Sequence, residues 1–539
     1  MKKLVSSILV IIMILAMSFP AFAAENTSLT ITNSAGREYA GYKLLNLTTS
    51  LKTGAHHVSH AGEHTSDCYN HAYTIVDKYR AILQEETLAN GRNELWVLTG
   101  KPTLASGVSD AQILEYLSYQ TSDNGDVYMT MRQVADRLYR AIKAAGIAAD
   151  KTGLTGNNDS IEQGYWMFAD VTNLTGNASN SLVMVDTKGQ DAITINSKTA
   201  LPTVEIKVKD IEDSEDGDIS DNYWHDSADH DITDSIPFKI TATLPGNAQF
   251  YESYKMLIHG KADAGLTVNN SSFKVYMYNT KHLADVDTDL NDYAKDVTDK
   301  FVIKTTGFAD DCTFEIICDN LFTIDGVTKD TAFVVSYNAI LNESAVIGAV
   351  GNNTKVYLEF SNDPYGNGIG KTESDNVKVF TYKLVINKVD SHGHDLEGAG
   401  FTLYKKDVLG NYNPLGSELK AANMVQFVWK GLDDGDYKLV ESTVPSGYNK
   451  MSDIVFSISA EHSEISNDPT LTLLDGGIAM GLGNVDSGTI EKKIENHTGT
   501  VLPETGAEGT FLLVCGGSVL VILAAVLMIT RKKMSVYED

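Results

Sequence analysis

Cysteine and proline are scarce in this chain of 539 residues, which has 4 of the first and 10 of the second. So few cysteines exclude a fold that is held together by a framework of disulfides. Positive charge is scarce as well, since 43 Lys and Arg stand against 71 Asp and Glu, for a net charge of −28. A protein that binds nucleic acid through its phosphates needs a basic face. The composition therefore excludes nucleic acid as a partner.

Hydrophobic residues make up 43% of the chain, which is ordinary for globular domains and too high for a disordered protein. The 25 tyrosines against only 10 prolines suit pleated, half-buried strands. A chain of this length should hold several domains. We therefore expect a protein of several folded domains that is rich in β-strands.

The first 23 residues have the order of a secretory signal peptide. Lys2 and Lys3 carry positive charge, a mostly apolar run follows, and residues 21–23 read Ala-Phe-Ala, with small residues at the two positions that a signal peptidase checks. A retained transmembrane anchor is the alternative, but the cleavage site and the polar sequence after it favour removal. We expect residues 1–23 to be cleaved and the secreted protein to begin near Ala24.

A second apolar run, from Phe511 to Thr530, stands near the other end of the chain. At a rise of 1.5 Å per residue, a helix of this length just spans the hydrocarbon core of a bilayer. A basic tail follows at once, Arg531-Lys532-Lys533, and such positive charge stays on the inner side. We expect a transmembrane helix over residues 511–530.

Leu502, Pro503, Glu504, Thr505 and Gly506 stand just before this run. The order of L-P-x-T-G, apolar run and basic tail resembles the cell-wall sorting signal of Gram-positive surface proteins. The resemblance implies that a sortase cysteine attacks the Thr505 carbonyl, releases the chain from Gly506 onward, and passes the acyl group to an amine. The thioester divides one difficult transamidation into two easier steps. The expected location is the cell wall, after brief retention in the membrane by the C-terminal helix.

We divide the chain between its two ends into three domains, over residues 24–198, 199–379 and 380–499, followed by the sorting signal in 500–539. The second and third show short alternating runs separated by turn residues, as in residues 236–244. The first also has two stretches with helical spacing. Their members are Ile75, Tyr79, Ile82 and Leu83, and then Met131, Val134, Leu138 and Ile142, with Gly146 as a stop. The expected fold class is mainly β, with a mixed N-terminal domain and tandem immunoglobulin-like β-sandwiches.

Strand alternation in the third domain places Lys388, Glu441 and Asn496 on apolar strand faces. Their neighbours on those faces are, in the same order, Leu384 and Ile386, Tyr437 and Leu439, and Ile490 and Ile494. Lys492 shares the parity of Asn496, so the third pattern is imperfect. Burying such polar groups is costly, which suggests that they have a purpose in the core.

The third domain resembles the collagen-adhesin B-type domains of Gram-positive pilins and adhesins over its whole length. The matching sequences are N-K-V-D at 387–390, the Y-x-L-x-E-x-x-x-P-x-G-Y box at 437–448, and I-E-N at 494–496. The resemblance implies an intramolecular isopeptide bond from Lys388 to Asn496, with Glu441 as its catalyst. Burial lowers the pKa of a lysine, so a neutral amine can attack the amide while a protonated Glu441 polarises it. Ammonia leaves and the reaction runs once, so this is self-modification rather than enzymatic turnover. An ordinary Lys–Glu pair on the rim is the alternative.

The second domain resembles the middle domain of backbone pilins in the segments 202–210, 337–341, 345–348 and 359–364. The resemblance places that family's bonding lysine at Ile206 and its carboxylate at Gly260, while Asn362 remains. Lys207 has the opposite parity and should face solvent with Glu205. We therefore predict that this domain has no isopeptide bond. A strand shifted by a bulge, which would turn Lys207 inward, is the alternative.

Backbone pilins also carry a lysine at the junction of the first and middle domains, usually after a Tyr-Pro pair. In the matching stretch, 193–202, Lys198 lies a few residues before Pro202, and Asn-Ser stands where Tyr-Pro is usual. The resemblance implies that Lys198 is the amine that accepts the acyl group of the next subunit. Lys188 and Lys207 are the alternatives.

Other clusters of chemically reactive residues lack a recognised spacing. They are His56, His57, His60, His64, Cys68 and His71, and the acidic runs at 213–221 and 285–289. Neither zinc-site nor EF-hand spacing occurs in them, so we interpret them as an inserted loop and solvated turns.

Cys312 and Cys318 are too far apart to bridge within one extended segment. The chain has no H-E-x-x-H, G-x-S-x-G or P-loop motif. We expect no cofactor, no metal and no enzyme activity.

These resemblances predict a structural subunit of a covalently polymerised, sortase-assembled pilus that is anchored to the cell wall. Thr505 of one subunit would be joined to Lys198 of the next. The expected partners are a pilus or housekeeping sortase, other copies of the chain, peptidoglycan and accessory pilins. The alternative is a monomeric wall-anchored adhesin for a host or environmental ligand, and the acceptor lysine distinguishes the two.

Overall fold

The structure of the protein is a computed structural model. It describes residues 26–51, 69–90, 107–118, 131–174, 176–188, 190–196, 200–211, 224–284, 289–463 and 465–499. The predicted signal peptide, Lys198 and the sorting signal, with the apolar run at 511–530, lie outside the described residues. Within the described ranges, no helix combines the length and the apolar character that crossing a membrane requires.

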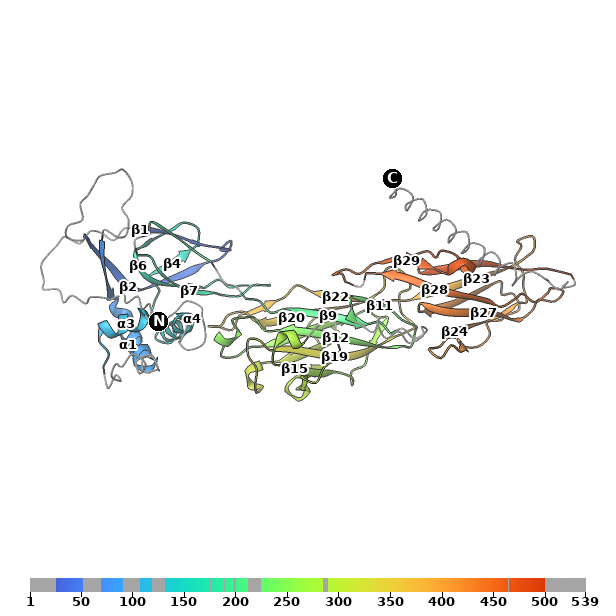
Figure 1. The fold of residues 1–539 in the computed structure, drawn as a ribbon, viewed down its shortest axis with the longest axis horizontal. Coiled ribbons are helices and arrows are strands. Elements are labelled where there is room, and N and C mark those ends of the chain that lie inside the picture. Colours follow the sequence, from blue (N-terminus) through green and yellow to red (C-terminus); the bar gives the residue numbers. More distant parts are fainter. Residues whose placement is uncertain are drawn as a thin grey trace, which may run out of the picture.

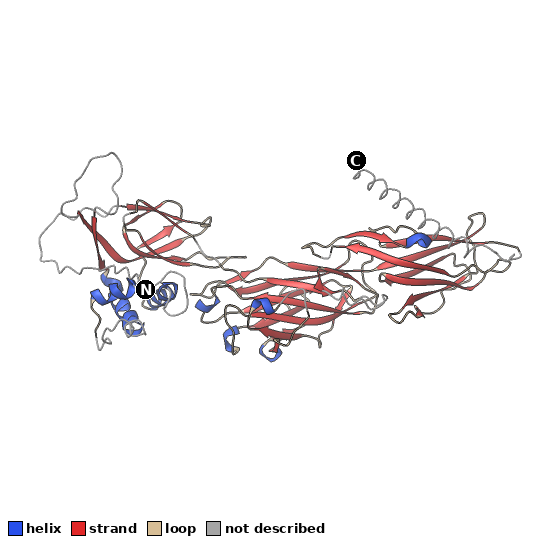
Figure 2. Cartoon of the chain, in the orientation of Figure 1, coloured by secondary structure: helices blue, strands red, loops and turns tan. Residues whose placement is uncertain are grey.

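The molecule is elongated, and three β-rich parts follow one another along its long axis (Figure 1). We call them the N-terminal part (residues 26–195), the middle sandwich (204–380) and the third sandwich (382–496). Among the described residues, the longer helices all belong to the N-terminal part, and strands dominate the other two (Figure 2). The predicted fold class, mainly β with helices in the first domain, is confirmed.

The N-terminal part contains two sheets and a group of helices. One sheet has the order β5-β1-β8, and the other has the order β3-β2-β6-β7 with β4 on β2. The strands are β1 (Asn26–Ile31), β2 (Tyr39–Leu51), β3 (Tyr69–Ile75), β4 (Lys151–Leu154), β5 (Asp159–Glu162), β6 (Gly164–Asp170), β7 (Leu182–Asp186) and β8 (Ala192–Ile195). The helices are α1 (Asp77–Asn90), α3 (Asp110–Ser118) and α4 (Met131–Ala144).

Both predicted helical stretches of the N-terminal part contain a helix. The spacing of the second is confirmed, because Val134, Leu138 and Ile142 of α4 are buried in the core. Gly146 ends it with a φ of +64°, and the N–H of the next residue donates to the Ile142 carbonyl, as in a Schellman cap. The first stretch was wrong at Ile75, which is the last residue of β3. The helix begins only at Asp77, whose acidic side chain suits a first turn.

The middle sandwich consists of two seven-stranded sheets. One has the order β10-β9-β12-β19-β15-β16 with β14 on β19, and the other has the order β11-β22-β20-β13-β18-β17 with β21 on β20. The first contains β9 (Val204–Lys209), β10 (Trp224–His225), β12 (Ser235–Thr243), β14 (Leu266–Val268), β15 (Lys274–Tyr278), β16 (Lys295–Asp296) and β19 (Ala332–Leu341). The second contains β11 (Ser227–Asp229), β13 (Met256–Ala262), β17 (Val302–Lys304), β18 (Phe314–Cys318), β20 (Asn352–Ser361), β21 (Ile369–Lys371) and β22 (Asp375–Phe380). Short 3-10 helices occur at Ala248–Phe250, Lys281–Leu283, Thr298–Lys300 and Leu321–Thr323.

The third sandwich pairs a sheet of order β26-β23-β30 with one of order β25-β24-β27-β28-β29. Its elements are β23 (Tyr382–Asp390), β24 (Gly400–Lys406), β25 (Tyr412–Pro414), β26 (Gln426–Leu432), β27 (Gly435–Thr443), β28 (Ile454–His462), β29 (Leu471–Asp475), the short helix α5 (Gly477–Met480) and β30 (Thr489–Asn496). Its core is a separate cluster of buried apolar residues between the two sheets.

The first and last strands of the third sandwich are parallel neighbours. Residues 383–390 of β23 pair in register with residues 489–496 of β30. Because β23 follows directly on β22 of the middle sandwich, its first residues lie at the joint between the sandwiches. Both strands therefore run away from that joint, and Asn496 lies at the far end of the molecule.

Candidate cross-linking site in the third sandwich

Lys388, Glu441 and Asn496 all point into the core of the third sandwich. The exposed fractions of the three residues are 0%, 0% and 1%. Lys388 lies on β23 and Asn496 on β30 of one sheet, and Glu441 lies on β27 of the facing sheet. Their expected neighbours Leu384, Ile386, Tyr437 and Leu439 are fully buried as well, so the alternation of β23 and β27 is as the sequence predicts.

The parallel register places Lys388 two positions before the residue that faces Asn496. Ile494 is paired with Lys388, and Asn496 is paired with Asp390. Lys388 Nζ donates hydrogen bonds to the Ile494 carbonyl at 2.9 Å and the Val389 carbonyl at 3.1 Å. The amine is thus held against the strand that carries Asn496, on the same buried face.

Glu441 binds the Asn496 side chain directly. The Asn496 Nδ2 donates to Glu441 Oε1 at 2.7 Å, and the backbone N–H of Met451 donates to Glu441 Oε2 at 2.9 Å. Asn496 Oδ1 is buried and has no hydrogen-bond partner among the described residues. A half-turn of the amide would place this oxygen against Glu441, where a protonated carboxyl could donate to it.

Burial lowers the pKa of the Lys388 ammonium to about 8, and the negative charges of Glu441 and Glu495 oppose this shift only in part. At pH 7 a pKa of about 8 leaves roughly a tenth of the amines neutral. A neutral amine is a nucleophile, and the nearby carboxyl group can move a proton, so the arrangement has the parts that amide formation needs.

In the middle sandwich, an aromatic core takes the place of such a site. Ile206 of β9 is fully buried, and a Cβ on Gly260 of β13 would stand 1.9 Å from Cζ of Phe314. The Phe314 ring therefore occupies the space that a carboxylate side chain would need. It packs against Phe273 and Tyr337, with ring centroids 5.1 and 5.0 Å away.

Lys207 turns away from this core, as its parity predicts, but it does not face open solvent. Its side chain is only 12% exposed, and its Nζ pairs with Asp226 Oδ1 at 2.8 Å. The prediction of a solvent-facing Lys207 was wrong because Asp226, just before β11, covers the outer face of the sheet. Asn362 is buried, and its Nδ2 makes a long contact of 3.4 Å with the Leu174 carbonyl of the N-terminal part.

The other predicted site residues divide between described and undescribed parts of the chain. Lys188 is exposed beyond the end of β7, whereas Lys198 lies in the undescribed interval between β8 and β9. Leu502, Pro503, Glu504, Thr505 and Gly506 are also outside the described residues. So are the acidic run at 213–221 and all of the histidine cluster except His71. Asp289 of the second acidic run pairs with Lys209 at 2.9 Å.

Two features of the site were missed in the sequence. The Met451 N–H that holds Glu441 follows the turn at Pro445–Tyr448, and only the length of that turn could have indicated it. The second is Phe314, for which no sequence signal exists, since nothing in a single chain says which aromatic ring fills the space beside a glycine. Cys312 and Cys318 are both buried and free.

Two protein families match segments of this chain. A model described as the SpaA prealbumin-like fold domain matches residues 382–470, and one described as the LPXTG cell wall anchor motif matches residues 494–535. The predicted sorting signal is thus confirmed, and the third sandwich has a prealbumin-like fold. The chain is a surface protein anchored to the cell wall of a Gram-positive cell.

Among curated proteins, the chain is similar to the trypsin-resistant surface T6 protein of Streptococcus pyogenes serotype M6. The two are 26% identical over 265 residues, which cover 37% of this chain and 48% of that protein. The chain therefore spans about half the length of this relative.

Among solved structures, the chain resembles the T6 backbone pilin of serotype M6 Streptococcus pyogenes, with 16% identity and a TM-score of 0.49. The likeness covers 89% of this chain and 100% of that one. It also resembles the full-length major pilin SpaD of Corynebacterium diphtheriae, with 14% identity, a TM-score of 0.41, and coverage of 67% and 87%. A third is the full-length major pilin RrgB of Streptococcus pneumoniae, with 12% identity, a TM-score of 0.37, and coverage of 66% and 87%. These similar proteins are described as pilins and a surface protein.

Proposed function

We propose that this chain is a structural subunit of a sortase-assembled pilus, in which Thr505 of one subunit is joined by an amide bond to Lys198 of the next. The observation that carries the proposal is the order of the reactive positions along the molecule. The sorting signal follows β30, whose last residue lies at the far end of the third sandwich. The acceptor lysine belongs to the segment between β8 and β9, at the other end of the middle sandwich. Two sandwiches therefore separate donor from acceptor, which suits a head-to-tail polymer.

The acceptor must be an exposed amine on a firmly held segment. Of the two alternatives to Lys198, Lys207 is a poor candidate because Asp226 covers and pairs with it. Lys188 is exposed and remains a rival. Lys198 lies in the chain between β8 and β9. Because β8 pairs with β1 and β9 pairs with β12, both ends of its segment are fixed in sheets, which favours Lys198 as the acceptor.

We also propose that Lys388 and Asn496 form an intramolecular isopeptide bond. The neutral Lys388 amine attacks Cγ of Asn496, and Glu441 donates a proton to the amide oxygen. Glu441 then carries a proton from the attacking nitrogen to Nδ2, the C–Nδ2 bond breaks, ammonia leaves, and the oxygen returns its proton to Glu441 as the carbonyl re-forms. The new bond joins Nζ of Lys388 to Cγ of Asn496, with no oxidant or cofactor. The burial of all three groups and the hydrogen bond from Asn496 to Glu441 support this proposal.

The assembly proposal is tested by immunoblots of cell-wall extracts in denaturing detergent. The parent chain should give a ladder of high-mass species, and Lys198→Ala should reduce it to a wall-linked monomer. Thr505→Ala should abolish both, because no acyl group can then be transferred. Lys188→Ala is the matched control and should keep the ladder. A parent strain with monomer alone would favour the wall-anchored adhesin, and a ladder that survives Lys198→Ala would assign another acceptor.

A further inference from the structure

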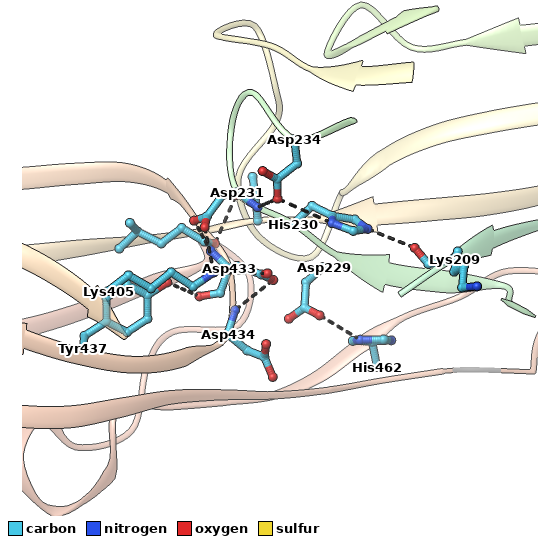
Figure 3. A network of polar contacts seen from close by, with 12 residues as sticks. Lys209, Asp229, His230, Asp231, Asp234, Lys405, Asp433, Asp434, Tyr437 and His462 are labelled. Carbon is cyan, nitrogen blue, oxygen red and sulfur yellow. Dashed lines mark hydrogen bonds and ion pairs between the residues drawn. The ribbon is translucent and has the colours of Figure 1, made fainter. Parts of the chain in front are cut away.

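His462, at the end of β28 in the third sandwich, lies beside Asp229 of the middle sandwich (Figure 3) and beside a second carboxylate, that of Asp210. Its Nε2 lies 3.4 Å from Oδ1 of Asp229 on β11 and 3.7 Å from Oδ2 of Asp210, which follows β9. One ligand-type atom from each of the three residues lies within 4.8 Å of the other two. The side chains of His462, Asp210 and Asp229 are 9%, 16% and 4% exposed.

The hydrogen bond of the other ring nitrogen of His462, Nδ1, fixes the orientation of the ring. Nδ1 lies 2.8 Å from Oγ of Ser227, and this hydroxyl donates its proton to the Ser463 carbonyl at 2.7 Å. The hydroxyl oxygen can therefore only accept from Nδ1–H. In the neutral ring, the lone pair of Nε2 then faces the two carboxylates. A histidine that binds a metal through one ring nitrogen usually donates its other ring N–H to a protein group in this way.

The distances around Nε2 are long for hydrogen bonds and suit neighbouring ligands of one metal ion. An N–H···O hydrogen bond spans about 2.7–3.2 Å, and both contacts are longer. With bonds of about 2.0–2.2 Å to zinc, neighbouring ligand atoms of a tetrahedral site stand about 3.3–3.6 Å apart. The separations of 3.4 and 3.7 Å lie close to that range.

Asp229 Oδ2 and the hydroxyl of Tyr382 are buried neighbours, and neither makes a close hydrogen bond to another group among the described residues. The Lys405 ammonium serves other carboxylates, at 2.7 Å from Asp231 and 3.4 Å from Asp433. Buried charges are normally paired or bound to metal.

We propose that His462 Nε2, Asp229 and Asp210 bind one Zn²⁺ ion, with water in the fourth position of a tetrahedral site. The ion ties the last residue of β28 to the middle sandwich and stiffens the joint between the two sandwiches. Ser227 is a positioning residue, because it acts only through the His462 ring.

The test is calorimetric titration of the metal-free full chain, purified in detergent, with Zn²⁺. His462→Gln should lose one bound equivalent relative to the parent, and the exposed His497→Gln should lose none. Ser227→Ala should keep the equivalent with an affinity that is about 10 to 100 times weaker. Zn²⁺ should also raise the midpoint of thermal unfolding of the parent more than that of His462→Gln.

Co²⁺ gives a second readout, because its visible absorption distinguishes a tetrahedral site. The spectrum of the parent minus that of His462→Gln should contain tetrahedral Co²⁺ bands. Equal numbers of Zn²⁺ equivalents in the parent and His462→Gln would overturn the proposal, as would a parent that binds no Zn²⁺. Either result would leave only the direct contacts of His462 with Ser227, Asp210 and Asp229 to join the two sandwiches here.

Discussion

Glu441 decides whether the buried polar groups of the third sandwich form only an ion pair or a site that can react. It binds Asn496 through one oxygen and the Met451 N–H through the other, so its position is fixed from both sides. A glutamine at this position has only one acceptor oxygen, so it could hold the Met451 N–H and donate its amide N–H to a turned Asn496, but it could not carry a proton between the amine and the amide. The chemistry proposed for the third sandwich therefore depends on one carboxyl proton.

Glu441→Gln should leave Lys388 and Asn496 unlinked. After allowance for the mass change of the substitution itself, the full chain should be heavier than the parent by one ammonia, and a tryptic digest should lose the branched peptide that joins the two residues. Because the link closes a loop of roughly a hundred residues, its loss should cost about 4 to 5 kcal/mol of stability. Glu495→Gln, on the exposed face of β30, is the control and should keep the link. A parent of full mass would rule the bond out.

The unlinked chain should also show a pH dependence that the linked chain lacks. The folded-state pKa of Lys388, about 8, is below its ordinary value of 10.5. Between these values the unfolded chain binds more protons, so the free energy of unfolding rises with pH, by at most about 1.4 kcal/mol per unit. The stability is lost again as the pH falls through 8. The charge of Glu441 raises the pKa of Lys388, and Glu441→Gln removes that charge. In this variant, the rise in stability therefore begins at a pH below 8.

Urea unfolding of Glu441→Gln between pH 7 and 10 measures this effect. Lys388→Met has no amine and should show no such rise, so the difference between the two chains isolates Lys388. Equal slopes in the two chains would mean that the buried amine does not have a lowered pKa.

At the scale of elements, β13 and β18 show how the middle sandwich packs without a reactive triad. Gly260 leaves room for the Phe314 ring, and the ring fills the core from the neighbouring strand. Gly260→Ala should destabilise the sandwich by roughly 3 kcal/mol, because a Cβ would stand 1.9 Å from the ring. Gly246→Ala is the matched control, since its nearest neighbour would be 3.9 Å away.

Thermal unfolding of these two variants measures the difference. Adding Phe314→Leu to Gly260→Ala should recover part of the loss, because the smaller side chain gives the new Cβ room. If Gly260→Ala is as stable as Gly246→Ala, the Phe314 ring is not the reason that position 260 needs a glycine.

Strand parity was the part of this architecture that the sequence could predict. It placed Lys388, Glu441 and Asn496 in one core because successive side chains of a strand alternate between its two faces. It also placed Ile206 inward and Lys207 outward. Alternation does not say what lies over the outer face, so the cover that Asp226 provides for Lys207 was missed. Nor does it set the ends of elements, so Ile75 was assigned to a helix although it closes a strand.

At the scale of the whole molecule, close contacts join the middle and third sandwiches. The Ile232 side chain of the middle sandwich lies where a Cβ of Gly431 would stand, and the Lys405 ammonium pairs with Asp231 at 2.7 Å. Gly348 and Gly488 also approach backbone to backbone across the joint. A subunit that transmits tension along its long axis benefits from joints of this kind.

The topology also predicts the path of a pulling force through the third sandwich. Tension that enters after β30 would cross the Lys388–Asn496 bond to β23 and pass directly into β22. The residues between the two bonded positions would carry none of it. Stretched between its ends in an atomic force microscope, the parent should keep this sandwich closed. Glu441→Gln should release roughly 370 Å of extra length. An equal release from the parent would show that force does not bypass the sandwich.

The most direct test of the assembly is mass spectrometry of the high-mass material that a protease releases from the cell wall. The account predicts a branched peptide in which the carbonyl of Thr505 is joined to Nζ of Lys198, with Gly506 absent. A Thr505 carbonyl that is joined only to peptidoglycan amines, in material from a strain that expresses the chain, would contradict it.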